Sequence, residues 1–341
     1  MTGLPPDAPA PDAATAGDAV GPIPHWPGRM ADLGGGERVW LAETNPARGA
    51  ASARELVLCV HGMSGAATNW TDFMGALAPD FDCVAVDLPG SGFSPPPRHA
   101  SGYSVAALAG TVIRLIETLA AGPVHLVGHS MGGAIAIRVA ARRPDLVRTL
   151  TLVSPVLPDR RINPATVHFP VISVPLLGEW IIGRYIRRYP PENRVAGVFA
   201  TCYYDPSRVH RERFALEVAE LRRRDGLSYG VRSLTRAART LTAETLRPRR
   251  LSLWRAAERL RVPALVLFGS HDRLVSPRLA VPAARAFRNA RVVVLPQSGH
   301  IAQMEHPATV AGLFREMVVE ARAGGMLTAV TPLSPDEART T

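Results

Sequence analysis

At 341 residues, 47% hydrophobic and 20% charged, the chain is long and apolar enough to form a large globular core. The formal net charge is +10 and every basic residue is an arginine, but the arginines are interleaved with acidic residues and no recognition motif accompanies them, which argues against a nucleic-acid-binding protein. No run of 18 apolar residues occurs, so we expect no membrane-spanning helix.

The first 26 residues include six prolines and six alanines and lack the basic start and apolar stretch of a secretory signal, so we expect a disordered tail. Cys59, Cys83 and Cys202 have no metal-ligand spacing, and the first two lie inside apolar runs. Free thiols are therefore expected, and a reducing compartment, the cytoplasm, is the predicted location.

Strands and helices then alternate along the chain. Residues Arg29 to Thr44 predict a β-hairpin broken at Gly34–Gly36. Apolar runs and helical spacing predict, in order, strands Leu56–Val60 and Cys83–Val86, a helix after the N-cap Ser104, strand Val124–Val127, helix Met131–Arg142, strand Leu150–Val153, strand Ala264–Phe268, a helix from about Arg278, strand Arg291–Leu295 and a helix from about Pro307. This alternation predicts an α/β fold, a mostly parallel sheet covered by helices on both faces.

Residues 156–258 interrupt the alternation. They carry 19 arginines against ten acidic residues, a net +9 of the chain's +10, and their apolar spacing is helical. We interpret them as a helical cap inserted before the penultimate strand of a core made of residues 27–155 and 259–323. Residues 324–341 are expected to form a loose C-terminal tail. The apolar start of the cap, which includes Phe169 and Trp180, is expected to line a substrate pocket.

A nucleophile motif lies between a predicted strand and a predicted helix. Gly128-His129-Ser130-Met131-Gly132 is a G-x-S-x-G sequence, and its position forces a sharp turn that lifts the serine hydroxyl out of the sheet. The amino end of the following helix offers free N–H groups to a developing oxyanion. This context predicts that Ser130 is a catalytic nucleophile.

A serine nucleophile needs a base, and the base needs an orienting acid. His300 follows the last predicted strand, at the carboxyl edge of the sheet where ligands of α/β folds bind, and is the predicted base. Asp272 follows the preceding strand at the same edge and is the predicted acid. Asp159, just past strand Leu150–Val153, is the alternative acid.

A loop after the first core strand, His61-Gly62-Met63-Ser64-Gly65, can direct the Met63 backbone N–H toward the oxyanion, beside that of Met131. Trp70 lies downstream, and the sequence allows it to lie either in the core or in the substrate pocket. The sequence Asp87-Leu88-Pro89-Gly90-Ser91-Gly92 is predicted to be a structural turn, since its glycines and proline account for it without chemistry.

These motifs together resemble the α/β-hydrolase superfamily, in the branch that includes cofactor-free haloperoxidases, carboxylesterases, monoacylglycerol lipases and carbon–carbon bond hydrolases. The resemblance rests on the His61-Gly62 loop, the stretch Asp87 to Gly92, the Ser130 turn, Gly269 to Asp272 and Ser298-Gly299-His300, in this order. It implies the α/β-hydrolase fold. Haloalkane dehalogenases and epoxide hydrolases of the superfamily use an aspartate nucleophile, so Ser130 argues against both.

The predicted function is hydrolysis of a carboxylic ester with a hydrophobic acyl or aromatic part, through an acyl-enzyme on Ser130, with no metal or organic cofactor. Trp70 and Trp180 are the predicted substrate-binding side chains. Carbon–carbon hydrolysis of a ring-cleavage product and a triad-retaining ligand receptor are the alternatives. The basic cap also permits a weak peripheral contact with membranes, whereas the oligomeric state is left open.

Overall fold

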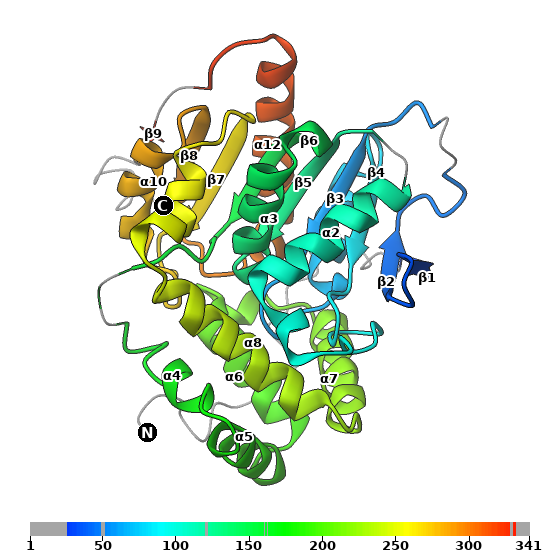
Figure 1. The fold of residues 1–341 in the computed structure, drawn as a ribbon, viewed down its shortest axis with the longest axis vertical. Helices are drawn as coiled ribbons and strands as arrows, with labels where there is room; N and C mark the ends of the chain where they lie inside the picture. The colour runs from blue at the N-terminus through cyan, green and yellow to red at the C-terminus, as the bar shows by residue number, and fades with distance from the viewer. Residues whose placement is uncertain are drawn as a thin grey trace.

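The computed structural model describes residues 26–48, 52–119, 122–159, 161, 163–327 and 330–331, and these form one sheet with helices packed around it (Figure 1). The sheet has nine strands in the order β1-β2-β4-β3-β5-β6-β7-β8-β9. The strands are β1 Gly28–Asp32, β2 Arg38–Glu43, β3 Leu56–Val60, β4 Asp82–Val86, β5 Val124–His129, β6 Val147–Val153, β7 Ala264–Gly269, β8 Ala290–Leu295 and β9 Val330–Thr331. The β1–β2 and β2–β4 pairs are antiparallel and the others parallel, which confirms the mostly parallel sheet.

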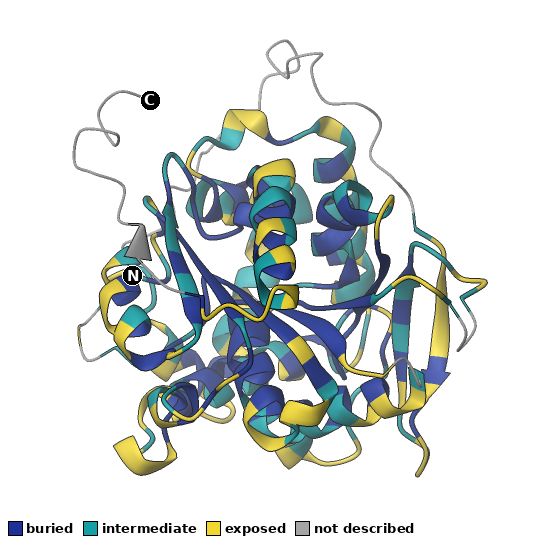
Figure 2. Ribbon diagram, turned by 90° about the horizontal axis from the view of Figure 1, so that it is seen from above, coloured by how far each residue is buried: buried dark blue, intermediate teal, exposed yellow. Residues whose placement is uncertain are grey.

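Two apolar layers cover the two faces of the sheet. Along β3, Leu56, Leu58 and Val60 belong to one buried cluster, whereas Val57 and Cys59 belong to the other, because successive side chains of a strand point to opposite faces. Helices α2 Val105–Leu119, α3 Met131–Arg142 and α10 Ala280–Ala286 complete the first layer, and α1 Thr71–Leu77 and α12 Pro307–Arg322 complete the second. Figure 2 shows the buried strands running between helices whose outer sides are exposed.

The ends of the core differ from the prediction. The predicted tail lies outside the described residues except for Trp26, whose indole N–H donates to the Thr71 carbonyl at 3.0 Å and whose ring packs on the core. At the other end, the expected loose tail contributes β9, which pairs with β8. The inserted segment precedes β7 and β8, as predicted, and the two-residue β9 adds one short strand after them.

Most of residues 156–258 forms a helical cap between β6 and β7. Its helices are α4 Phe169–Ile172, α5 Leu177–Arg188, α6 Pro191–Cys202, α7 Arg211–Asp225 and α8 Gly230–Thr245, and they lie together at one edge of the sheet (Figure 1). The next helix, α9 Leu253–Ala257, instead buries its apolar residues in the first layer beside α3, so it belongs to the core. From here on, the cap means α4 to α8.

A third apolar cluster and several buried charges fix the cap to the core. Val195 and Phe199 of α6 and Val218 of α7 pack against Ile301 and Met304 beside the sheet edge. The fully buried Arg213 side chain donates to the Thr68 carbonyl at 2.9 Å and pairs with Asp72 at 2.8 Å. Arg194, Arg222 and Arg223 pair with carboxylates inside the cap. Cys59, Cys83 and Cys202 are free and buried, as predicted.

No helix in the described ranges is long and apolar enough to cross a membrane.

Candidate active site

Ser130 occupies a strained turn between β5 and α3. Its backbone has φ 52° and ψ −114°, a left-handed conformation that costs an L-residue about 1–3 kcal/mol and that packing must maintain. The Ser130 N–H donates to Val153 O at 3.0 Å, and the Ser130 carbonyl accepts from Val156 N at 3.1 Å. The turn is thereby tied to β6, and the serine lines a cavity below the cap.

Two glycines allow this turn to lie against the neighbouring strand. A Cβ on Gly132 would lie 2.1 Å from the Val60 carbonyl oxygen, and one on Gly128 would lie 2.5 Å from the Gly132 carbonyl oxygen. Both distances are far below a van der Waals contact with backbone that cannot move away. Gly132 is thus explained by the close approach of α3 to β3, and Gly128 by the close approach of the end of β5 to the first turn of α3.

The loop after β3 lies directly beside the serine. A Cβ on Gly62 would be 3.0 Å from Ser130 Cβ and 2.9 Å from His129 Nδ1, so only glycine fits without displacement. This contact brings the Met63 backbone near the amino end of α3, where Met131 begins the helix. The Gly65 N–H donates to Gly62 O at 3.2 Å and closes the loop. Within the loop, Ser64 has a positive φ of 62°.

His300 and Asp272 are brought together as the sequence predicts. The His300 Nδ1 lies 2.8 Å from Asp272 Oδ2, and both side chains are buried. The second oxygen, Asp272 Oδ1, accepts hydrogen bonds from the backbone N–H groups of Leu274 and Val275, each at 2.8 Å. These two bonds fix the carboxylate, and the carboxylate orients the imidazole.

Groups on three sides position the loop that carries His300. Its backbone N–H donates to Cys202 O in the cap at 2.6 Å, and its carbonyl accepts from His129 Nε2 at 3.1 Å. The buried carboxylate of Glu305 accepts from Gly299 N–H at 2.7 Å and from the backbone N–H groups of Tyr204 and Asp205 in the cap, at 2.8 and 3.1 Å. The position of His300 therefore depends on the junction between cap and core.

Burial keeps two histidines of the site neutral. Burial lowers the pKa of His129 well below its ordinary value, and the nearby His300 lowers it further. Burial also lowers the pKa of His61 to about 4, although its hydrogen bond to Gly62 O opposes the shift. Neutral His61 accepts from Leu88 N–H through Nε2 at 3.0 Å, so it joins the loop after β3 to the loop after β4.

The stretch Asp87 to Gly92 has a structural role. Asp87 is buried, and its carboxylate accepts from Ala67 N–H at 2.6 Å and from Phe93 N–H at 2.8 Å. Burial raises the pKa of Asp87 to about 6, against the effect of those two bonds. Asp87 is absent from the lining of the cavity, so the prediction of a structural turn agrees with its position.

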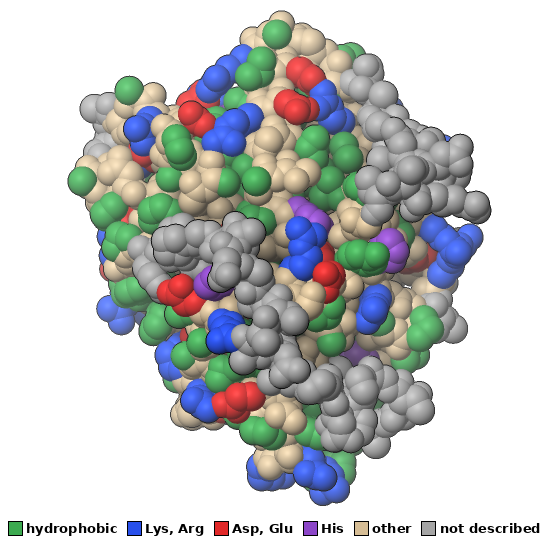
Figure 3. All heavy atoms as spheres, turned by 180° about the vertical axis from the view of Figure 1, so that it is seen from behind, with side chains coloured by type: hydrophobic (Ala, Val, Ile, Leu, Met, Phe, Trp, Pro, Cys, Tyr) green, Lys and Arg blue, Asp and Glu red, His purple; other side chains and the backbone are tan. Residues whose placement is uncertain are grey.

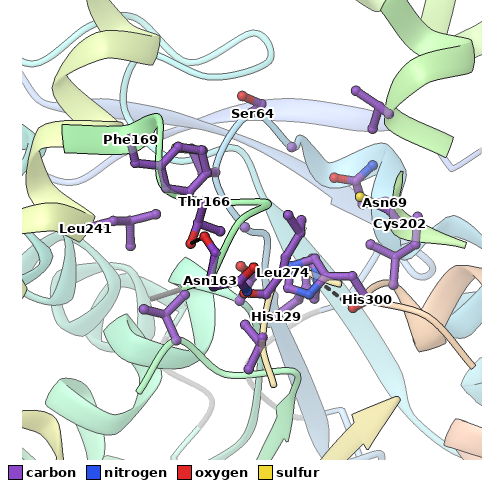
Figure 4. Close-up of a pocket in the computed structure, with 18 of the residues that line it drawn as sticks. Ser64, Asn69, His129, Asn163, Thr166, Phe169, Cys202, Leu241, Leu274 and His300 are labelled. Carbon is purple, nitrogen blue, oxygen red and sulfur yellow. Dashed lines mark hydrogen bonds between the residues drawn. The ribbon is translucent and has the colours of Figure 1, made fainter. Parts of the chain in front are cut away.

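A cavity of about 630 Å³ opens between the sheet edge and the cap, within the size range of small-molecule sites. Ser130, His300, Gly62 and Met63 line its floor. The remaining walls are mostly apolar. Their residues from the cap and the positions beside it include Val167, Phe169, Val195, Val198, Phe199, Leu221, Leu241 and Leu246. In Figure 4, Phe169 and Leu241 lie on one side of the cavity, and Asn69, Cys202 and His300 lie on the other.

One part of the wall is polar. Asn69, Glu217 and Arg224 all line the cavity. The Arg224 guanidinium donates to Ser64 O at 2.8 Å, and Glu217 accepts from Asn69 Nδ2 at 3.2 Å. Burial raises the pKa of Glu217. This polar end adjoins the loop that carries Met63.

Both predicted substrate-binding tryptophans require correction. Trp70 has no exposed surface and packs against Phe73 in the second layer, with ring centroids 5.6 Å apart, so it is a core residue. Trp180 is 62% exposed on α5 and does not line the cavity. Of the apolar residues from Phe169 to Ile182, only Phe169 and Pro170 line the cavity. The side chain of a tryptophan follows its packing environment, which a local sequence pattern does not determine.

The alternative acid, Asp159, is not the hydrogen-bond partner of His300. Asp159 lines the cavity, but its carboxylate accepts from Arg161 N–H at 3.0 Å and forms no hydrogen bond with His300. Sequence reasoning missed His129 and Glu305, which position His300, and also missed Arg224 and Leu241 in the cavity. The position of His129 inside the G-x-S-x-G sequence was an available signal, whereas Glu305 had none beyond its closeness to His300 in the chain.

Comparisons with known proteins show which family the chain resembles. Residues 57–313 match the alpha/beta hydrolase family. The acetyltransferase component of the acetoin cleaving system of Pseudomonas putida is 30% identical over 295 residues, covering 85% of this chain and 68% of that protein. A pimeloyl-[acyl-carrier protein] methyl ester esterase of Neisseria meningitidis is 28% identical over 267 residues, covering 77% of this chain and 93% of that protein.

The fold is also shared with solved structures. The haloalkane dehalogenase DbeA of Bradyrhizobium elkani superimposes with a TM-score of 0.69 at 24% identity, covering 88% of this chain and all of that one. The predicted α/β-hydrolase fold is thereby confirmed. Because a dehalogenase has the same fold, the fold alone does not determine the reaction, which must be argued from the residues of the site.

Proposed function

The chain belongs to the alpha/beta hydrolase family and is a hydrolase, and from this premise we propose that it cleaves carboxylic esters through an acyl-enzyme on Ser130. The observation that carries the proposal is the hydrogen bond of 2.8 Å between His300 Nδ1 and Asp272 Oδ2 at the cavity that Ser130 lines. The esterase from Neisseria meningitidis among the relatives supports an ester as the substrate class.

Acylation is the first half of the reaction. Neutral His300, with its proton on Nδ1 and held there by Asp272, accepts the Ser130 proton at Nε2 while the serine oxygen attacks the ester carbonyl. The C=O electron pair moves onto oxygen, and the backbone N–H groups of Met63 and Met131 stabilise that charge. When the intermediate collapses, the bond to the alkoxy oxygen breaks and His300 returns the proton to the leaving alcohol.

Deacylation repeats these steps with water. His300 takes a proton from water, the hydroxide adds to the acyl carbonyl, and collapse of the second intermediate releases the carboxylic acid and returns the proton to Ser130. In the imidazolium state, the Asp272 carboxylate stabilises the positive charge. Its own two backbone hydrogen bonds keep it from rotating away during each cycle.

The walls of the cavity indicate the substrate class. Phe169, Phe199 and Leu241 and their aliphatic neighbours favour a hydrophobic acyl or aromatic group, because such a group leaves no buried polar atom without a partner. The smaller polar end near Asn69 and Arg224 can take a carbonyl or hydroxyl group. We therefore propose an ester of a medium-sized hydrophobic acid or alcohol.

Turnover of a substrate panel tests this function. The panel contains p-nitrophenyl esters of graded acyl length and one ring-cleavage dienone, each with wild-type protein and with Ser130→Ala. We expect ester turnover that rises with acyl length until the cavity is filled, and a loss on the order of 10⁴- to 10⁶-fold in kcat in the variant. Turnover of the dienone alone would favour the carbon–carbon hydrolase, and turnover of neither would favour a ligand receptor.

A further inference from the structure

The outer tip of the cap exposes a run of large apolar side chains. Leu176 is 83% exposed and Trp180 is 62% exposed. Val167, Val171, Val174 and Leu177, from the same 14 residues, also expose about half of their side chains. Scattered exposed apolar residues are normal on protein surfaces, but six large ones within 14 residues of chain indicate an interaction surface. We call this group, Val167 to Trp180, the apolar tip.

Helix α5 joins the apolar tip to a basic face. Leu177, Trp180, Arg184, Arg187 and Arg188 recur at three- and four-residue spacing, so they lie along one side of α5, and all five are exposed. The half-buried residues between them face the other side, where α5 packs against α4 and α8. The exposed side is therefore apolar over its first turn and basic over its last two turns.

The three arginines of this face are not paired with carboxylates of the described residues. Unlike Arg194, Arg213 and many other cap arginines, they form no ion pair with any carboxylate in the part of the chain that the structure describes. Arg188 is exposed, and its Cζ atom lies 5.6 Å from the centroid of the Tyr189 ring. Figure 3 shows basic side chains at the lower end of the molecule, where Figure 1 places α5.

The apolar tip is also continuous with the cavity. Val167, Phe169 and Pro170 line the cavity, and the exposed Val171, Val174 and Leu176 follow them directly in the chain. The first residues of the apolar tip therefore form part of the cavity wall, and the exposed ones follow within a few positions. A second copy of this chain, which has a formal charge of +10, would not complement three free arginines, whereas an anionic surface would.

We propose that the cap tip docks on an anionic lipid membrane, and that the apolar tip inserts between headgroups while Arg184, Arg187 and Arg188 bind lipid phosphates. An exposed helix with an apolar part, a tryptophan and a basic part has the features of an interfacial anchor. The proposal rests on the proposed function in one respect, that the substrate is a hydrophobic ester drawn from that membrane. Docking itself does not depend on catalysis.

Flotation with vesicles tests the docking. The full chain is mixed with vesicles of phosphatidylglycerol and phosphatidylcholine, or of phosphatidylcholine alone, at low and high salt. Each arginine near an anionic surface contributes about fivefold to binding, so Arg184→Gln/Arg187→Gln/Arg188→Gln should weaken it by roughly 100-fold. A matched variant, Arg278→Gln/Arg285→Gln/Arg288→Gln, removes the same charge from three other exposed arginines and should float like wild type.

The apolar part has its own variant. Leu176→Ser/Trp180→Ser changes two exposed side chains, so the fold is retained, and it should lower binding to anionic vesicles even at low salt. The proposal would be overturned if the wild type did not float, or if both arginine variants lost vesicle binding equally. It would also be overturned if the wild type formed a dimer that the serine variant dissociates. Turnover of a soluble ester, measured on the same samples, tests the proposed function separately, because the tip variants should leave it unchanged.

Discussion

Replacing Asp272 by asparagine should nearly abolish turnover while leaving the protein folded. The two backbone N–H groups of Leu274 and Val275 both donate to Asp272 Oδ1, so the amide oxygen of the asparagine must take that place. Its NH₂ group then faces His300 Nδ1, where a carboxylate oxygen now lies at 2.8 Å. The amide donates to Nδ1 and forces the imidazole proton onto Nε2, which can no longer accept the proton of Ser130.

This tautomer change predicts a decrease in kcat of about 10⁴-fold, equivalent to about 5.5 kcal/mol of transition-state stabilisation. Because the three hydrogen bonds of the side chain are conserved in number, thermal unfolding should change little. The assay is steady-state kinetics on a p-nitrophenyl ester together with the melting temperature. Asp159→Asn is the control and should remain near wild type. A kcat for Asp272→Asn within tenfold of wild type, or a slow Asp159→Asn, would refute the assignment of the acid.

Two further predictions concern stability. Gly132→Ala places a Cβ 2.1 Å from Val60 O and should destabilise the fold by at least about 1–3 kcal/mol in urea unfolding. The control Gly312→Ala has open space inside α12 and should leave stability unchanged or raise it. Equal effects of the two changes would contradict the close packing of the turn on β3. Burial lowers the pKa of His61 from 6.5 to about 4. The contribution of neutral His61 to the free energy of unfolding is therefore fully present above pH 6.5 and is lost as the pH falls toward 4. The loss amounts to about 3 kcal/mol. His61→Gln should flatten this dependence relative to wild type and to the exposed control His99→Gln, and an unchanged pH profile would argue against a buried neutral His61.

The core of the fold was predictable because its strands are continuous apolar runs. The predicted bounds of β3 and α3 agree with the structure to the residue. The start of β6 at Val147 lies three residues before the prediction, since Arg148 and Thr149 interrupt the apolar pattern. Thr149 is buried all the same, and its hydroxyl lies 2.8 Å from His125 Nδ1. A buried polar residue whose hydrogen-bond partner lies on another strand thus breaks the apolar pattern from which a strand is predicted.

The closeness of Ser130, Asp272 and His300 could be predicted from the sequence because the carboxyl ends of parallel strands meet at one edge of the sheet. The cavity could not be predicted in the same way. Its walls combine Phe169 of α4 with Leu241 of α8, more than 70 positions apart, and they meet through the packing of cap helices on one another. Helical periodicity shows which residues share a face, but it does not show which face meets the cavity.

Covalent labelling of the serine tests the central claim most directly. Wild-type protein is treated with a fluorophosphonate, and its intact mass and labelled peptide are determined. The account predicts one adduct per chain, on Ser130, with none in Ser130→Ala and slow labelling in Asp272→Asn. An adduct on another residue, or equal labelling of Ser130→Ala and wild type, would contradict it.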